Sequence, residues 1–130
     1  MLDIDHFKQF NDLYGHLVGD GCLQSLAYAL AQSGRRSGEL VARYGGEEFM
    51  VILPETTIDE ASFVAERIRR AIEKHPFVSE EGAPMASLTV TIGLSSLPER
   101  ASTKKDLIRT ADIAMYKGKT SGKNKVVIFE

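Results

Sequence analysis

Residues 41–53 read VARYGGEEFMVIL. Two short apolar segments, residues 41–44 and 49–53, flank the pair Gly45-Gly46, and this arrangement predicts a β-hairpin. Glycine tolerates a positive φ and leaves the backbone bare for a ligand, although a turn of the Gly-Gly type needs no ligand at all. We predict the rest of the fold outward from this hairpin.

Three further segments have strand patterns. Residues 87–96 alternate between two faces, which is the period of a β-strand. Residues 1–5 are typical of the end of a strand, and residues 125–130 of a short terminal strand. The two faces of the alternating segment carry Leu88, Val90, Ile92 and Leu94 on one side and Thr89, Thr91 and Gly93 on the other.

Helices are expected between these strands, because residues 22–30, 61–72 and 107–115 repeat apolar side chains at helical spacing. The resulting order is strand, helix, hairpin, helix, strand, helix, strand. A hairpin within an otherwise alternating order predicts an α/β (α+β) fold, in which helices cover a mixed sheet. The expected start and stop signals are Thr57 with Glu60, Thr103 with Asp106, Ser33-Gly34, Pro76 and Gly122.

Composition limits the class of protein. The chain has 130 residues, 43% of them hydrophobic, and a net charge of −2, which suits one globular domain over residues 1–130 and excludes a disordered chain. The longest apolar run, residues 26–31, is far shorter than the roughly 20 residues of a membrane span, and no secretory signal is visible. Cys22 is the single cysteine, so a cytoplasmic setting is expected. The sequence pI of about 5.9 argues against nucleic-acid binding.

Four carboxylates are candidates for a metal site. Asp3 and Asp5 lie two residues apart and share a face if the strand continues that far, while Glu47 and Glu48 follow the glycine pair. Carboxylate oxygens are the ligands that Mg²⁺ prefers, with phosphate oxygens completing its coordination. On residue type alone, the simpler interpretation is favoured, namely a strand terminus and two solvated turn residues.

Three separated motifs resemble one protein family. Residues 43–49, RYGGEEF, are similar to the signature loop of the GGDEF family, the diguanylate cyclases, in its GGEEF spelling. Residues 2–8, LDIDHFK, begin a block that resembles the upstream motif of the family, and the resemblance runs from Leu2 to about Ile128. The other matching positions are Asn11, Asp12, Tyr14, Gly15, His16, Gly19 and Asp20 upstream, and Ala111, Asp112, Tyr116, Lys119, Gly122, Lys123 and Asn124 downstream.

The resemblance implies a fold of the nucleotide-cyclase type, similar to the ferredoxin-like palm of polymerases, with a central, mostly antiparallel sheet flanked by helices. It also implies a reaction, the condensation of two GTP molecules into cyclic di-GMP and two pyrophosphates, by attack of one 3′-hydroxyl on the other α-phosphate. Each subunit of a homodimer would hold one GTP, and the active site would form where the subunits face each other. The alternative is a non-enzymatic domain that binds GTP or cyclic di-GMP and reports it to a partner.

For the metal, the resemblance implies Mg²⁺, or Mn²⁺ in its place, held by Asp3, Glu47 and the backbone carbonyl of Ile4. Glu47 is also the candidate to accept the proton of the 3′-hydroxyl, although a metal-bound carboxylate is a weak base. Asp5 is expected either to help a second metal ion or to have a structural part.

For the triphosphate, the resemblance implies Lys8, Lys119 and Lys123, with Lys8 stabilising charge in the transition state. Position 123 departs from the family, which more often has Arg there, and Lys lacks the bidentate fork. Glu48 would contact the nucleotide or balance the charge of Lys8. The alternative for the C-terminal lysines is that they complement a helix dipole, as a cluster that also includes Lys117 and Lys125.

For the guanine base, the resemblance implies Asn11 and Asp20, with His16 beside them. Acceptors that pair with guanine N–H groups find no matching donors on adenine, which favours GTP over ATP. The simpler interpretations are a helix N-cap for Asp20, a helix terminus for Asn11 and a turn for His16. The remaining residues of the implied substrate-binding set are Phe7, Gly45 and Gly46.

A second site is suggested by Arg36 and Glu39, with five residues between Glu39 and Gly45. Many family members have R-x-x-D there and bind inhibitory cyclic di-GMP, whereas this chain has R-x-x-E, with Arg35 adjacent. Family domains also have a segment before the first strand, so we expect the chain to lack its N-terminal segment. A sensory or receiver domain is expected in the full-length protein, with no membrane span within this chain.

Overall fold

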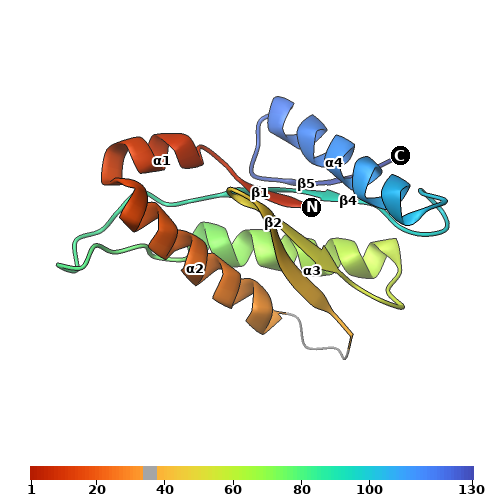
Figure 1. Ribbon diagram of the computed structural model, residues 1–130, viewed down its shortest axis with the longest axis horizontal. Helices are drawn as coiled ribbons and strands as arrows, with labels where there is room; N and C mark the ends of the chain where they lie inside the picture. Colours follow the sequence, from red (N-terminus) through yellow and green to blue (C-terminus); the bar gives the residue numbers. More distant parts are fainter. Residues whose placement is uncertain (34–37) are drawn as a thin grey trace.

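The computed structural model describes residues 1–33 and 38–130 and confirms the predicted α/β fold (Figure 1). One more helix is present than the sequence predicts. The elements of the described residues are β1 (Leu2–Ile4), α1 (Phe7–Tyr14), α2 (His16–Ser33), β2 (Leu40–Gly45), β3 (Glu48–Ile52), α3 (Ile58–Lys74), β4 (Val90–Leu94), α4 (Lys104–Thr120) and β5 (Val126–Ile128).

The strands form one sheet in the order β2-β3-β1-β4-β5. All neighbours pair antiparallel except β4 and β5, which are parallel. The mostly antiparallel sheet is therefore confirmed. Figure 1 shows α4 on one side of this sheet, with α2 and α3 on the other.

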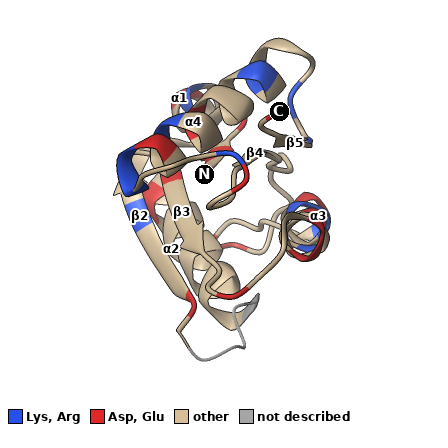
Figure 2. Ribbon diagram, turned by 90° about the vertical axis from the view of Figure 1, so that its right-hand side faces the viewer, with Lys and Arg blue, Asp and Glu red and all other residues tan. Residues whose placement is uncertain are grey.

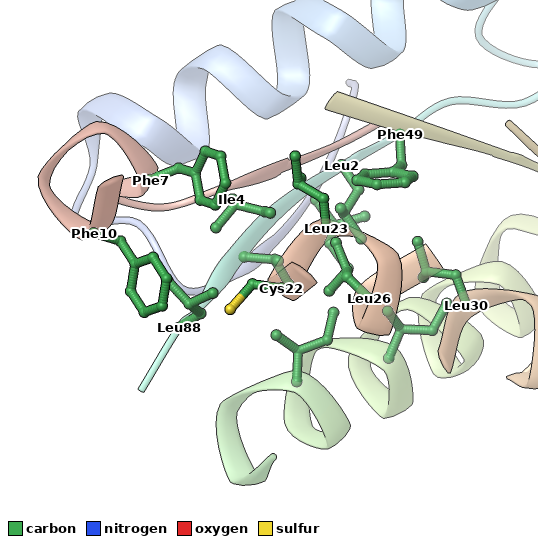
Figure 3. Close-up of a cluster of buried hydrophobic side chains, with 14 of the residues drawn as sticks. Leu2, Ile4, Phe7, Phe10, Cys22, Leu23, Leu26, Leu30, Phe49 and Leu88 are labelled. Atoms are coloured by element: carbon green, nitrogen blue, oxygen red, sulfur yellow. The ribbon is translucent and has the colours of Figure 1, made fainter. Parts of the chain in front are cut away.

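The larger core lies on the side of α2 and α3. Successive side chains of a strand point to opposite faces, so Leu2 and Ile4 of β1 share this face, and Leu2 stands opposite Phe49 of β3 and Ile92 of β4. Apolar side chains of α1, α2 and α3 pack against them (Figure 3). The helical members of this core are Phe7, Phe10, Cys22, Leu23, Leu26, Leu30, Ala65, Ile68 and Ile72.

On the opposite face, α4 lies unusually close to β4. A Cβ on Gly93 would be only 2.1 Å from the carbonyl oxygen of Ala111 and 2.3 Å from the nitrogen of Met115, distances that no real side chain permits. Met1, on the same face, packs with Ala111 and Met115. Glycine at this strand position therefore lets the α4 backbone rest directly on the sheet.

The predicted cap signals of the two long helices are confirmed. Thr57 and Glu60 form a complete capping box at the start of α3, and the Thr103 side chain accepts from the backbone nitrogen of Asp106 at the start of α4. The alternating strand is shorter than predicted, since β4 spans only Val90–Leu94. None of the described helices has the length and apolar character needed to cross a membrane.

The predictions between residues 6 and 21 are wrong in detail. The separate helix α1 was not expected, Asn11 lies inside it rather than at a terminus, and His16 is the first residue of α2 rather than a turn residue. Asp20 consequently stands inside α2 and is not its N-cap. The physical reason is tertiary: two glycines near Asp20 lower helix propensity, but packing against α1 requires one of them, as described below.

The hairpin is confirmed, with a different local structure. Gly45 belongs to β2, and the turn consists of Gly46 and Glu47. Neither glycine has a φ in the left-handed region, and a Cβ on Gly46 would meet nothing within 4 Å. The backbone conformation therefore does not require the glycine pair, which instead leaves open space beside the turn.

Candidate active site

The strand register brings polar side chains to the face that α4 covers. Leu2 and Ile4 point away from α4, so Asp3 between them points toward it. In the register, Asp3 stands opposite Glu48 of β3 and Thr91 of β4. The backbone nitrogen of Ile4 also donates to the Glu47 carbonyl oxygen at 3.4 Å. The end of β1 and the hairpin turn therefore form one side of a polar site.

A cavity of about 680 Å³ lies between α1, α4 and this polar side, which consists of the end of β1 and the hairpin turn. Eight of the residues predicted for metal, phosphate or catalysis line it: Asp3, Ile4, Phe7, Lys8, Glu47, Glu48, Lys119 and Lys123. These residues come from segments more than 100 positions apart in the chain. The remaining lining residues are His6, Gln9, Asp112, Ile113, Met115 and Tyr116.

Lys119 of α4 joins the two aspartates of the β1 segment. Its Nζ lies 2.5 Å from Oδ1 of Asp3 and 2.7 Å from Oδ1 of Asp5, and it donates to the Asp3 carbonyl oxygen at 3.2 Å. Asp3 and Asp5 are therefore on one side, as predicted, although β1 ends at Ile4. Lys119 does more than complement the helix dipole.

Asp5 is buried and fully occupied by protein donors. Besides Lys119, its carboxylate accepts from Thr91 Oγ1 at 2.7 Å, Thr89 Oγ1 at 2.8 Å and the backbone nitrogen of Asn124 at 2.9 Å. Burial raises the pKa of Asp5, but the hydrogen bonds from Lys119, the two threonines and Asn124 outweigh it and lower the pKa below its usual value. Of the two predicted parts for Asp5, these contacts favour the structural one.

Acidic groups gather around Glu48. Burial raises the pKa of Glu48, and the negative charges of Asp3, Asp112 and Glu47 raise it further, against a smaller opposite effect of Lys119. Such a group of carboxylates is stabilised by a cation, and its oxygen donors suit Mg²⁺ or Mn²⁺. Within the described residues, however, no three His, Cys, Asp or Glu side chains already converge on one point. The donor set fits a metal that also takes backbone and phosphate oxygens.

Asn11 and Gly19 mark the contact between α1 and α2. The Oδ1 of Asn11 is buried and has no hydrogen-bond partner within the described part of the chain. It lies where a Cβ on Gly19 would be, at 1.8 Å from the ideal position. Glycine at position 19 is therefore required for Asn11 to keep this orientation, and an unpaired buried acceptor is costly unless a ligand supplies a donor.

The other predicted substrate-binding residues lie outside the main cavity. Asp20 lines a second cavity of about 400 Å³ together with Arg43, Phe49 and residues of α2. His16 is exposed, and neither His16, Gly45 nor Gly46 lines either cavity. The structure shows no ion pair between Glu48 and Lys8 among the residues it describes, so the charge-balance alternative for Glu48 has no support.

Of the predicted inhibitory pair, only Glu39 is among the described residues. Arg36 lies outside the described residues, together with Arg35. Glu39 precedes β2 and is half-buried, and its Oε2 has no hydrogen-bond partner among the described residues. Whether the pair forms a site stays a prediction.

Several lining residues were assigned no role from the sequence. Asp112 and Tyr116 lie on the same face of α4 as Lys119, at helical intervals of four and three residues, so this spacing was a usable signal. Arg43 of β2 was visible only as part of the signature motif. Asn124 matched the downstream motif but was assigned no role, because its contacts come from distant segments.

The fold and the cavity together define a class: palm-like α/β domains that place carboxylates and lysines around one cavity at the end of a mostly antiparallel sheet. Residues 1–125 match the family described as "Diguanylate cyclase, GGDEF domain". The chain belongs to this family.

Individual relatives agree with this assignment. The response regulator PleD from Caulobacter vibrioides is 42% identical over 127 residues, which are 98% of this chain but only 28% of PleD. The GGDEF domain of PA1120 (YfiN or TpbB) from Pseudomonas aeruginosa has a TM-score of 0.92 and 34% identity, and the match covers 99% of this chain and 79% of that one. The active GGEEF domain of a diguanylate cyclase from Vibrio cholerae has a TM-score of 0.89 and 35% identity, over 99% and 80% of the two chains.

Proposed function

We propose that this chain is a diguanylate cyclase that condenses two GTP molecules into cyclic di-GMP and two pyrophosphates. The observation that carries the proposal is the single cavity that collects Asp3, Glu47, Lys8, Lys119 and Lys123 from both ends of the chain. Family membership and the similarity to an active GGEEF domain support it.

The metal ligands we propose are Asp3, Glu47 and the carbonyl oxygen of Ile4. Mg²⁺ or Mn²⁺, when bound, supplies Lewis-acid stabilisation of phosphate charge. Glu47 lies in the hairpin turn, where its carboxylate is the group we assign to accept the proton of the 3′-hydroxyl oxygen. Glu48 is proposed to contact the nucleotide beside it.

The lysines are proposed to bind the triphosphate. Lys8 is exposed at the start of α1 and lines the cavity from one side, while Lys119 and Lys123 line it from the other. Positive charges aimed at the phosphates stabilise the charge that develops in the transition state. Phe7 is buried and also lines the cavity, and we propose that it contacts the substrate.

Specificity for guanine is proposed to come from Asn11 and Asp20, with His16 nearby. The Oδ1 of Asn11, which has no hydrogen-bond partner among the described residues, supports this, because an N–H group of guanine would supply the donor that it lacks. Adenine offers no donor at the corresponding ring nitrogen, so it leaves the acceptor unpaired. Gly45 and Gly46 are proposed to let the nucleotide approach the bare hairpin backbone.

Catalysis needs a second nucleotide, so we propose a homodimer in which each chain holds one GTP. The chain spans 28% of the length of PleD, and we propose that a sensory or receiver domain in the full-length protein controls this assembly in the cytoplasm. Product inhibition at Arg36 and Glu39 is a further part of the proposal.

The test is to incubate the concentrated protein with Mg²⁺ and GTP and to detect cyclic di-GMP by mass spectrometry. Glu47→Gln and Asp3→Asn are each expected to lower the rate by about 10²–10³ or more, while the exposed control Glu81→Gln retains it. A protein that binds GTP or cyclic di-GMP but makes no product would contradict the enzyme and favour the non-enzymatic binding domain.

A further inference from the structure

Three consecutive residues after α4 have left-handed backbone conformations. The φ angles are 112° at Gly122, 59° at Lys123 and 46° at Asn124. Glycine adopts such angles freely, but residues with a Cβ do so rarely, Asn being the more tolerant. A strained segment of this kind persists only where its surroundings hold it, and such segments concentrate at functional sites.

The Asn124 side chain and backbone are what hold this segment. Its backbone nitrogen donates to Oδ2 of Asp5 at 2.9 Å. Its Nδ2 donates to Oε1 of Glu73 at 2.7 Å, and its Oδ1 accepts from Nη1 of Arg69 at 2.6 Å. Asn124 is therefore held from three directions, whereas the one hydrogen bond of Lys123 with the described residues runs from its backbone nitrogen to the Gly118 carbonyl oxygen at 3.0 Å.

Arg69 and Glu73 belong to α3, on the opposite face of the sheet from α4 and the cavity (Figure 1). Arg69 is the centre of an ion-pair network on this helix, with Glu66 at 2.8 Å and Glu73 at 3.0 Å. Figure 2 views α3 end-on, with acidic and basic positions coloured along its ribbon. The network therefore ties the loop beside the cavity to the far layer of the protein.

We propose that Arg69, Glu73 and Asp5 act as positioning residues that hold Asn124, and that Asn124 thereby keeps Lys123 in the cavity. The proposal rests on the proposed function, in which Lys123 binds the triphosphate. Asp5 also pairs with Lys119, so one buried carboxylate sets the location of both lysines on this side. No residue of α3 touches the nucleotide in this arrangement; α3 acts only through Asn124.

The test measures the Kd of an α,β-methylene analogue of GTP, which cannot undergo transfer, with Mg²⁺ present. Asn124→Gly keeps the backbone angle accessible and removes only the side-chain contacts, and it is expected to raise the Kd about tenfold. In a background of Lys123→Ala the same change is expected to have no further effect, because the residue that it positions is gone. A purely structural loss would instead add to that of Lys123→Ala.

Two matched variants on α3 test the same proposal without changing the loop itself. Arg69→Met removes the contact with Asn124 and is expected to raise the Kd several-fold. Arg70→Met removes an ion pair with the same Glu66, at 2.8 Å, but no contact with Asn124, and is expected to leave the Kd unchanged. Thermal unfolding of each variant shows whether it is folded.

The outcomes separate the two proposals. Equal Kd values for the wild type, Asn124→Gly and Arg69→Met would overturn the positioning proposal alone, as would full additivity with Lys123→Ala. A wild-type protein that binds no analogue would overturn it together with the proposed function. A wild-type protein that binds the analogue, shows the expected variant effects and makes no cyclic di-GMP would overturn only the cyclase.

Discussion

The two sides of the cavity differ in how firmly their side chains are held. On the side formed by α4 and the loop after it, which we call the held side, Lys119 and Asn124 are fixed by Asp5, Arg69 and Glu73. The other side consists of α1, α2 and the hairpin, and we call it the open side; Lys8 lines the main cavity there, whereas Asn11, His16 and Asp20 lie outside it. The exposed side chains of Lys8, His16 and Asp20 make no hydrogen bond or ion pair with the described residues, and the Asn11 Oδ1 has no partner among them.

Under the proposed function, this difference predicts where a nucleotide would gain its binding energy. On the held side, Lys119 and Asn124 are already fixed by protein contacts, so under the proposed function these side chains would lose little entropy when phosphates bind. The open side still has unsatisfied groups that a nucleotide base can satisfy. Variants of the fixed side chains on the held side should therefore change stability as well as binding, and variants of the unpaired side chains on the open side chiefly binding.

The largest effect is expected for Lys119→Met. This change leaves the carboxylate of Asp5 buried without its cationic partner, which costs about 3–5 kcal/mol of the free energy of unfolding. Urea denaturation measures the loss. Lys117→Met, in the same turn of α4 but exposed, is the control and should change stability by less than about 0.5 kcal/mol. Similar values for the two variants would show that the held side is not held by this pair.

The next largest effect on stability is expected at the contact between α1 and α2. Gly19→Ala forces a Cβ against the Asn11 side chain and is expected to cost about 1–3 kcal/mol of stability. Gly21→Ala, two residues further along the same helix, meets nothing within 4 Å and is expected to stabilise the protein by about 0.5–1 kcal/mol, because alanine is the better helix former. Thermal unfolding of both variants checks the opposite signs, and equal signs would contradict the assigned contact.

A smaller effect, on binding rather than stability, is expected for Asn11→Ala. Removing an acceptor that has no partner should leave the free energy of unfolding within about 0.5 kcal/mol of the wild type or raise it. If guanine supplies the missing donor, the Kd of GTP should rise about tenfold. Calorimetric titration with GTP, paired with urea denaturation, separates the two quantities; a destabilised protein with normal affinity would mean that Asn11 is already satisfied in solution.

The smallest effect is a pH dependence on α3. Hydrogen bonds from Arg69 and Arg70 are the main reason that the pKa of Glu66 is lowered from 4.5 to about 2. Because the folded-state pKa lies below the unfolded one, this stabilisation is present above about pH 4.5 and is lost as the pH falls toward about 2. Solvent screening of the partly exposed carboxylate limits it to about 0.5–1 kcal/mol. Glu66→Gln should flatten the stability profile in this window, and an unchanged slope would show that the arginines are held by other partners.

Much of the fold was predictable from local patterns. The alternation in residues 87–96, the capping pairs and the glycine-containing hairpin each depend on neighbouring residues, and each gave the correct element. The error at α1 and α2 arose because Gly15, Gly19 and Gly21 lower helix propensity locally, while the contact of Gly19 with Asn11 is made between two helices. Helix propensity is a local property, so it does not predict a contact between two helices.

The residues that line the cavity were also predictable only in part. The motifs named Asp3, Glu47, Lys8, Lys119 and Lys123, and the structure places all five on one cavity. The contacts that hold these residues in place were not predictable. Arg69 and Asn124, for example, are 55 positions apart and meet only when the helices pack on the two faces of the sheet. Resemblance to a family indicates which residues face a ligand better than it indicates which residues hold them in place.

The placement of β4 has a consequence for the timescales of motion at the site. From Val90 to Gly93 this strand is buried on both faces, and it pairs with β1 on one edge and β5 on the other. Its amide protons can exchange with solvent only when most of the protein opens, whereas the exposed Gly45-Gly46 segment can open locally at low cost. The central strand and the hairpin turn are therefore expected to open on different timescales, because the strand opens only with most of the fold and the turn opens by itself.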